Sequence, residues 1–179
     1  MTSEYYAPAA CRHQQGDQKP GGLAVVAIGN TLRADDGIAQ AVCRALPTSV
    51  KKQACCFDLG THTYFLIDCL RGHSAAIIID STSSDNPPGT ITVLDLAELV
   101  ASHSPLKCRF SHGISLLDEL TVGLWRGLLP ATVLFVGIEA ASDGWGEQLS
   151  DTLAEKLPEV TAEVEKLIQG LLEGEKINA

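Results

Sequence analysis

Basic residues are scarce in this sequence, and their scarcity excludes one class of partner. Lysine and arginine together number 13 against 22 acidic residues, which gives a formal net charge of −9 and an isoelectric point near 4.9. No basic stripe is present to neutralise phosphates, so we expect no nucleic-acid partner. The chain also lacks an apolar run approaching the roughly 20 residues of a membrane span, and its start does not resemble a signal peptide. We therefore expect no membrane partner.

Paired cysteine motifs are absent as well. None of the six cysteines belongs to a C-x-x-C pair, so the sequence contains neither a zinc ribbon nor a thioredoxin-type motif. Adjacent Cys55 and Cys56 lie in a predicted strand, where their side chains would face opposite sides. Buried reduced thiols are favoured over a disulfide framework, which predicts a cytoplasmic protein.

Three familiar catalytic signatures are missing. Residues 29–33 (GNTLR) lack the second and third glycines of the dinucleotide-binding G-x-G-x-x-G motif. The chain contains neither a G-x-S-x-G nucleophile elbow nor a P-loop. A Cys–His pair stays open as an alternative, although no cysteine follows a predicted strand-to-helix turn.

The sequence does contain the apolar patterns of one ordinary domain. Its 179 residues are 45% hydrophobic and 20% charged, which is typical of a globular chain large enough to bury a core. We expect a flexible N-terminal extension at residues 1–22, a single domain at 23–173 and a C-terminal tail at 174–179.

Strands and helices are predicted to alternate along this domain. Strands are expected at residues 23–28, 53–57, 75–80, 90–94 and 132–138. Helices are expected from Asp36 to a stop at Pro47, from a cap at Thr61 to Gly72, after residues 111–113, and beyond residue 146, with Pro158 in the first turn of a new helix. The pattern predicts a three-layer α/β/α sandwich with a five-stranded, mostly parallel twisted sheet. The strand at 90–94 is the expected antiparallel edge strand, since its link from Asp80 is too short for a helical crossover.

Acidic residues and a histidine are predicted to meet at one edge of this sheet. Parallel strands joined by crossover helices place their carboxyl ends along the same edge. Asp80 ends the apolar run 75–80, Asp36 follows the first strand, and His112 precedes the helix that leads back to the fifth strand. Glu139, at the end of that strand, joins them. Two carboxylates with a histidine are a credible site for a divalent metal of intermediate hardness.

Each of these residues also has a purely structural interpretation. Asp35 or Asp36 could be the N-cap of the following helix, and His112 could cap the next one. Asp80 could only begin a turn with the polar residues after it. The joint position of Asp36, Asp80 and His112 at the ligand-binding edge favours a functional interpretation. His62 is predicted at the same edge but lacks ligand spacing.

Ordered blocks of the sequence resemble one protein family. Residues 27–37 (AIGNTLRADDG) are similar to the G-N-x-L-x-x-D-[DE]-G signature of nickel-iron hydrogenase maturation proteases. Residues 77–80, 88–90, 111–116 and 136–139 match the later blocks of that family in order and approximate spacing. The resemblance spans residues 23–172.

The resemblance implies a function and a site. It implies an aspartyl-type endopeptidase that removes the C-terminal extension of a hydrogenase large-subunit precursor after nickel insertion. Residue by residue, the positions thought to contact the substrate's nickel correspond to Asp36, Asp80 and His112, which are therefore the catalytic and nickel-contacting candidates. The nickel is expected to arrive with the substrate instead of being permanently bound. The family also implies a monomer with a five-stranded mixed sheet between helices.

Two other functions remain as alternatives on the sequence alone. A non-catalytic chaperone or binding module that recognises a metal-loaded partner would show nickel-dependent association without a shortened product. A small-molecule hydrolase with a permanently bound metal would still carry that metal after purification. For the protease, either a metal-activated water or a carboxylate acting as general base would carry the chemistry.

Overall fold

The computed structural model describes residues 21–96, 109–110 and 114–178 of the chain. Most of the predicted N-terminal extension and the block at 111–113, which contains His112, lie outside these residues. The predicted domain limits stay predictions. At the other end, helix α6 (Asp151–Asn178) runs into the stretch that was expected to be a tail.

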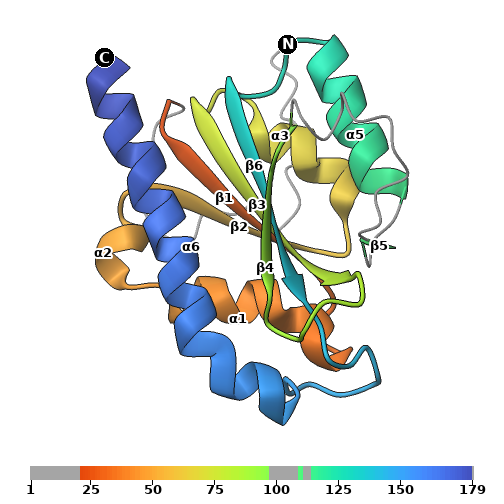
Figure 1. Cartoon of the computed structure of the whole chain (residues 1–179). Coiled ribbons are helices and arrows are strands. Elements are labelled where there is room, and N and C mark those ends of the chain that lie inside the picture. Colours follow the sequence, from red (N-terminus) through yellow and green to blue (C-terminus); the bar gives the residue numbers. More distant parts are fainter. Residues whose placement is uncertain (1–20, 97–108, 111–113, 179) are drawn as a thin grey trace, which may run out of the picture.

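A mixed sheet forms the centre of the molecule (Figure 1). Its strand order is β2-β1-β3-β6-β4. The strands are β1 (Leu23–Ile28), β2 (Ala54–Gly60), β3 (Ala75–Ser83), β4 (Ile91–Asp95) and β6 (Thr132–Glu139). The first three and β6 are parallel neighbours, whereas β4 pairs antiparallel with β6 at the sheet edge. The predicted five-stranded sheet with one antiparallel edge strand is confirmed, and a two-residue strand β5 (Arg109–Phe110) adds an antiparallel pairing to β3.

Helices cover both faces of this sheet, which confirms the three-layer α/β/α architecture. Helix α1 (Ile38–Ala45) and α6 pack on one face, and α3 (Leu66–Leu70) and α5 (Ile114–Trp125) pack on the other (Figure 1). The remaining helical turns are η2 (Ala34–Gly37), α2 (Thr48–Lys51) and η3 (Thr63–Phe65). Successive residues of β1 contribute to two separate cores, which explains why its sequence is apolar throughout.

Two strands are longer than predicted. Strand β3 does not end at Asp80 but continues to Ser83. It continues because Thr82 and Ser83 pair with β5, while Asp80 and Thr82 stay in register with Gly137 and Glu139 of β6. Strand β2 likewise runs to Gly60, which pairs with Ile28, so the turn expected at residues 58–60 is part of the strand.

Two helix starts also differ from the predictions. Pro158 does not begin a new helix, since it lies inside the continuous helix α6. Thr61 is not a cap, because the helical segment begins with η3 at Thr63 and no side-chain capping bond precedes it. Within the described segments, no helix is long and apolar enough to cross a membrane.

The four cysteines of the described residues, Cys43, Cys55, Cys56 and Cys69, are reduced. Cys55 joins the core under α3 and α5, and Cys56 packs against the core under α1 and α6, which confirms that they face opposite sides. Burial raises the pKa of Cys43 to about 12 and also raises the pKa values of Cys55 and Cys56. These three thiols therefore stay protonated and poorly reactive near neutral pH.

Candidate functional site

The sheet register brings Asp36 and Asp80 to the same edge. Ala27 of β1 pairs with Ile79 of β3, so Asp80 stands level with Ile28, the last residue of β1. Asp36 lies on η2, the 3-10 turn that follows the loop after β1. Asp80 has no exposed surface, and Asp36 is 6% exposed. The fold thus places both residues at the same edge of the sheet.

Ser81 links the two carboxylates directly. Its hydroxyl donates a 2.6 Å hydrogen bond to Oδ1 of Asp36, and its backbone N–H donates a 2.8 Å bond to Oδ1 of Asp80. The other oxygen of Asp36 accepts the backbone N–H of Asn30 at 3.0 Å. Each carboxylate therefore has at least one oxygen held in a fixed direction by a neighbouring donor.

The backbone at Gly29 fixes how the chain turns from β1 towards Asp36. Gly29 has φ +145°, and a Cβ atom there would lie 1.9 Å from the carbonyl oxygen of Asp36. Only glycine allows this approach. Gln40 of α1 holds the same turn, since its Nε2 donates to the Gly29 carbonyl and to Oδ1 of Asp58, each at 3.1 Å. The position of Asp36 is thus tied to the ends of β1 and β2.

Asp35, next in sequence to Asp36, has a different environment. Its Oδ2 accepts 2.9 Å hydrogen bonds from the N–H groups of Ala141 and Ser142 and from the hydroxyl of Ser150. Its Oδ1 accepts the N–H of Ser150 at 2.7 Å. The carboxylate joins the η2 turn to the loop between β6 and α6. Neither Asp35 nor Asp36 acts as an N-cap, because no side-chain capping bond is made at the start of η2 or α1.

Glu139 lies at the predicted edge, but its carboxylate is occupied by hydrogen bonds to the end of β3 and the segment after it. It accepts hydrogen bonds from the Ser84 N–H at 2.6 Å, the Ser84 hydroxyl at 2.7 Å and the Thr82 hydroxyl at 2.9 Å. Burial raises the pKa of Glu139, but the hydrogen bonds from Ser84 and Thr82 lower it by a larger amount. The pKa of Glu139 therefore lies below its usual range. Glu139 anchors the segment after β3 to the end of β6.

The third predicted ligand, His112, lies outside the described residues. Within the part of the chain that is described, no group of three or more histidine, cysteine or acidic side chains is arranged to hold a metal. Asp36 and Asp80 alone supply two carboxylates, and carboxylates with an imidazole fit a divalent metal of intermediate hardness. His62 is an exposed residue whose ring packs against Tyr64, with centroids 5.7 Å apart.

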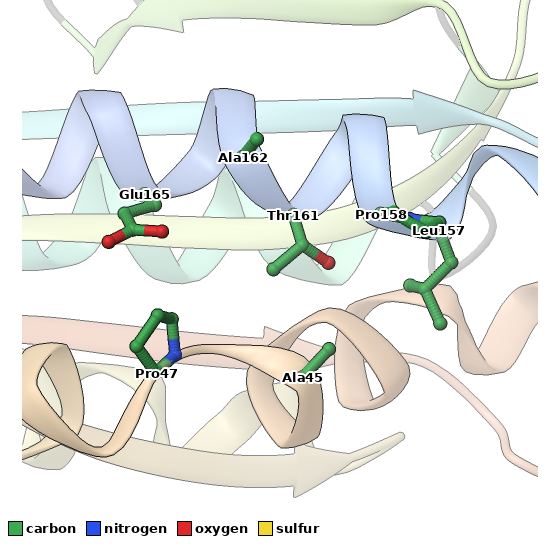
Figure 2. A pocket seen from close by; sticks show the side chains of 7 residues that line it. All are labelled: Ala45, Pro47, Leu157, Pro158, Thr161, Ala162 and Glu165. Carbon is green, nitrogen blue, oxygen red and sulfur yellow. The ribbon is translucent and has the colours of Figure 1, made fainter.

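A pocket elsewhere on the molecule does not share this chemistry. Figure 2 shows it between helix α6 and the segment that leads from α1 to α2, with a volume near 330 Å³. Its lining is mainly apolar and consists of Ala45, Pro47, Leu157, Pro158, Thr161, Ala162 and Glu165. Because neither Asp36 nor Asp80 lines it, this pocket is not part of the carboxylate site.

Comparisons with known proteins agree with this architecture. The model of the hydrogenase maturation protease family matches residues 41–167, a stretch that includes Asp80, His112 and Glu139 and begins after Asp36. Comparison with curated protein sequences gives no significant match.

Solved structures of hydrogenase maturation proteases share the fold. The HybD protease from Thermococcus kodakarensis is 26% identical with a TM-score of 0.67, and the match covers 82% of this chain and 99% of that one. The maturating endopeptidase HybD from E. coli is 23% identical with a TM-score of 0.67, covering 83% and 93% of the two chains. An endopeptidase from Escherichia coli is 24% identical with a TM-score of 0.64, covering 80% and 89%.

The family model spans most of the domain, and the sheet with its helical layers is that of these proteases. This chain therefore belongs to the hydrogenase maturation protease family and is an endopeptidase that processes the C-terminal end of a hydrogenase large-subunit precursor.

Proposed function

We propose that Asp36, Asp80 and His112 recognise nickel carried by the precursor and thereby hold its C-terminal extension for cleavage. The observation that supports this proposal most strongly is the pair of bonds made by Ser81, which donates its hydroxyl to Asp36 and its backbone N–H to Asp80 at the edge where ligands of α/β sheets bind. The role of His112 rests on its place in the sequence blocks. With Asp36 and Asp80 as its catalytic residues, the enzyme would be an aspartyl-type endopeptidase.

The burial of the carboxylates bears on where the nickel comes from. Asp80 has no exposed surface and Asp36 is only 6% exposed. A free ion in solution therefore has little access to both side chains, and contact requires a rearrangement of this edge when the precursor binds. This agrees with nickel that arrives with the substrate.

The residues of the chain would then position the scissile peptide. Ser81 and Asn30 keep the Asp36 carboxylate oriented, and Ser81 does the same for Asp80. A nickel ion held by such ligands supplies Lewis acidity to the scissile carbonyl or to an attacking water. A precursor without nickel cannot make these contacts with the enzyme. The same ligands would therefore distinguish a nickel-loaded precursor from a nickel-free one.

We further propose that the enzyme acts as a monomer in the cytoplasm. The reduced cysteines Cys43, Cys55, Cys56 and Cys69 fit a reducing compartment.

The test compares nickel-loaded and nickel-free precursor incubated with the purified protein, with product masses measured by mass spectrometry. We expect a shortened large subunit only from the loaded precursor, and none with Asp80→Ala. Asp95→Ala is the matched control, because Asp95 pairs with Leu134 near the start of β6, at the opposite edge of the sheet. A fully active Asp80→Ala enzyme with normal thermal unfolding would remove Asp80 from the site. Nickel-dependent association without a shortened product would favour the binding-module alternative.

A further inference from the structure

Two loops beside the carboxylates expose large side chains. Trp145 is 84% exposed and Leu32 is 52% exposed. The guanidinium carbon of Arg33 lies 5.8 Å from the centroid of the Trp145 ring, within the range of a cation–π contact. We call Leu32, Arg33 and Trp145 the Trp145 patch. An exposed tryptophan next to an arginine has the composition of a binding hot spot.

The backbone under this patch is held by both loops. Ala34 N–H donates to the Gly146 carbonyl at 2.7 Å, and Gly146 N–H donates to the Leu32 carbonyl at 3.0 Å. Asp35 fastens the far side of the same two loops through its four hydrogen bonds. Because the backbone is already ordered, a partner that covers Trp145 would pay little additional loop-ordering entropy.

The charge of the patch indicates what would cover it. Arg33 donates to the Asp143 carbonyl at 2.9 and 3.1 Å and forms an ion pair with the Asp143 carboxylate at 3.6 Å. The arginine charge is thus matched by Asp143, which lies beside the patch. The complementary surface on a partner is therefore apolar or aromatic, and no strongly acidic segment is required.

The patch is also continuous with the proposed site. Leu32 and Arg33 belong to the loop that runs from Gly29 to Asp36, and Asn30 of this loop donates its N–H to Asp36. In Figure 1 the loop between β6 and α6 lies beside this segment, at the arrowhead end of the parallel strands. A protein seated on Trp145 would therefore contact the loop that leads to Asp36.

We propose that the Trp145 patch is the docking surface for the folded body of the large-subunit precursor, which it holds while the C-terminal extension reaches Asp36 and Asp80. This inference rests on the proposed function. It assigns affinity for the precursor to Trp145 and Leu32, and it assigns cleavage to the carboxylates.

The chain contains a matched control for this proposal. Of its two tryptophans, Trp125 is 85% exposed and ends α5, the helix that leads to the start of β6. It therefore lies towards the opposite edge of the sheet. We expect Trp145→Ala to raise KM for the nickel-loaded precursor about tenfold with kcat unchanged within about twofold, as for a hot-spot residue. Trp125→Ala should match the wild-type enzyme in both constants.

A second variant and a binding measurement keep the test decisive. Leu32→Asp places a charge on the patch and should raise KM in the same way, with an unchanged urea midpoint. If the wild-type enzyme leaves the precursor uncut, the proposed function fails, and the dissociation constants of the precursor for Trp145→Ala and Trp125→Ala still decide the docking proposal. Equal dissociation constants would overturn it. Loss of a wild-type self-association in Trp145→Ala, measured by sedimentation, would instead assign the patch to a second copy of this chain.

Discussion

Replacing Asp35 by asparagine preserves the size of the side chain but removes an acceptor from a carboxylate that has four donors. The asparagine oxygen can occupy the position of Oδ2, where it keeps the bonds from Ala141, Ser142 and the Ser150 hydroxyl. The amide group then faces the N–H of Ser150, which loses its 2.7 Å bond and meets another donor. The opposite orientation loses three bonds instead of one.

The cost follows from the energetics of hydrogen bonds to charged groups. One such bond contributes about 1.5–3 kcal/mol, and a donor left without an acceptor adds to the loss. We therefore expect Asp35→Asn to lower the free energy of unfolding by about 2–4 kcal/mol. For a chain of this length the melting temperature should fall by roughly 5–15 °C.

The same substitution at Asp36 provides the comparison. An asparagine oxygen there can still accept the Asn30 N–H, and its amide can donate to the Ser81 hydroxyl, which turns to accept. The free energy of unfolding should change by less than about 1 kcal/mol, since both bonds remain. Processing of the nickel-loaded precursor should be lost, because the charged ligand is gone.

Urea denaturation followed by circular dichroism measures both effects, provided that the slope m is unchanged. Mass spectrometry of the precursor measures processing in parallel. An Asp35→Asn protein with the wild-type midpoint would refute the anchoring role of Asp35. If Asp36→Asn were destabilised as much as Asp35→Asn, the division into an anchoring role for Asp35 and a ligand role for Asp36 would be refuted.

Three further predictions follow from individual contacts. Gly29→Ala should lower the urea midpoint strongly, since its Cβ would lie 1.9 Å from the Asp36 carbonyl oxygen, whereas Gly170→Ala in open space on helix α6 should leave it unchanged or raise it. Because folding lowers the pKa of Glu139, the ionised side chain stabilises the protein above about pH 4.3, and this contribution is lost as the pH falls through the folded pKa. Glu139→Gln should therefore flatten the acid side of the stability–pH curve, and an unchanged curve would contradict this. Since burial raises the pKa of Cys43 to about 12, iodoacetamide at pH 8 should modify Cys43 in the native protein much more slowly than in urea, and equal rates by peptide mapping would refute this.

Much of the fold could be predicted because its strands are buried on both faces. A strand such as β1, whose alternate residues enter two cores, has to be apolar throughout, and this pattern is visible in the sequence. The predicted end of β3 at Asp80 was wrong, because Ser81, Thr82 and Ser83 are polar residues of the kind that form turns. Their strand conformation depends on pairing with β5 and β6, which are distant in sequence.

Pro158 illustrates another long-range effect. Proline lacks the N–H of an internal helix bond, so local rules place it at a helix start. In the folded chain, Leu153 on one side of it and Val160 and Val164 on the other are buried in the same core. Burial of this shared apolar stripe favours a continuous helix despite the missing bond.

The candidate site was predictable to a similar degree. Topology alone placed Asp36 and Asp80 at one edge, but it could not distinguish Asp35 from Asp36. The donors to Asp35 come from Ala141, Ser142 and Ser150, more than 100 residues away. The bridging role of Ser81 was missed because this residue was assigned to a turn. The role of His112 stays a prediction.

The central position of β3 has a consequence for amide hydrogen exchange. Ile77, Ile78 and Ile79 are hydrogen-bonded between β1 and β6 and have no exposed surface, so their amides should exchange only when the whole molecule unfolds. Asp80 directly follows these residues and is therefore mounted on the slowest-exchanging part of the protein, so a rearrangement that a substrate causes at this edge should leave the backbone of β3 in place.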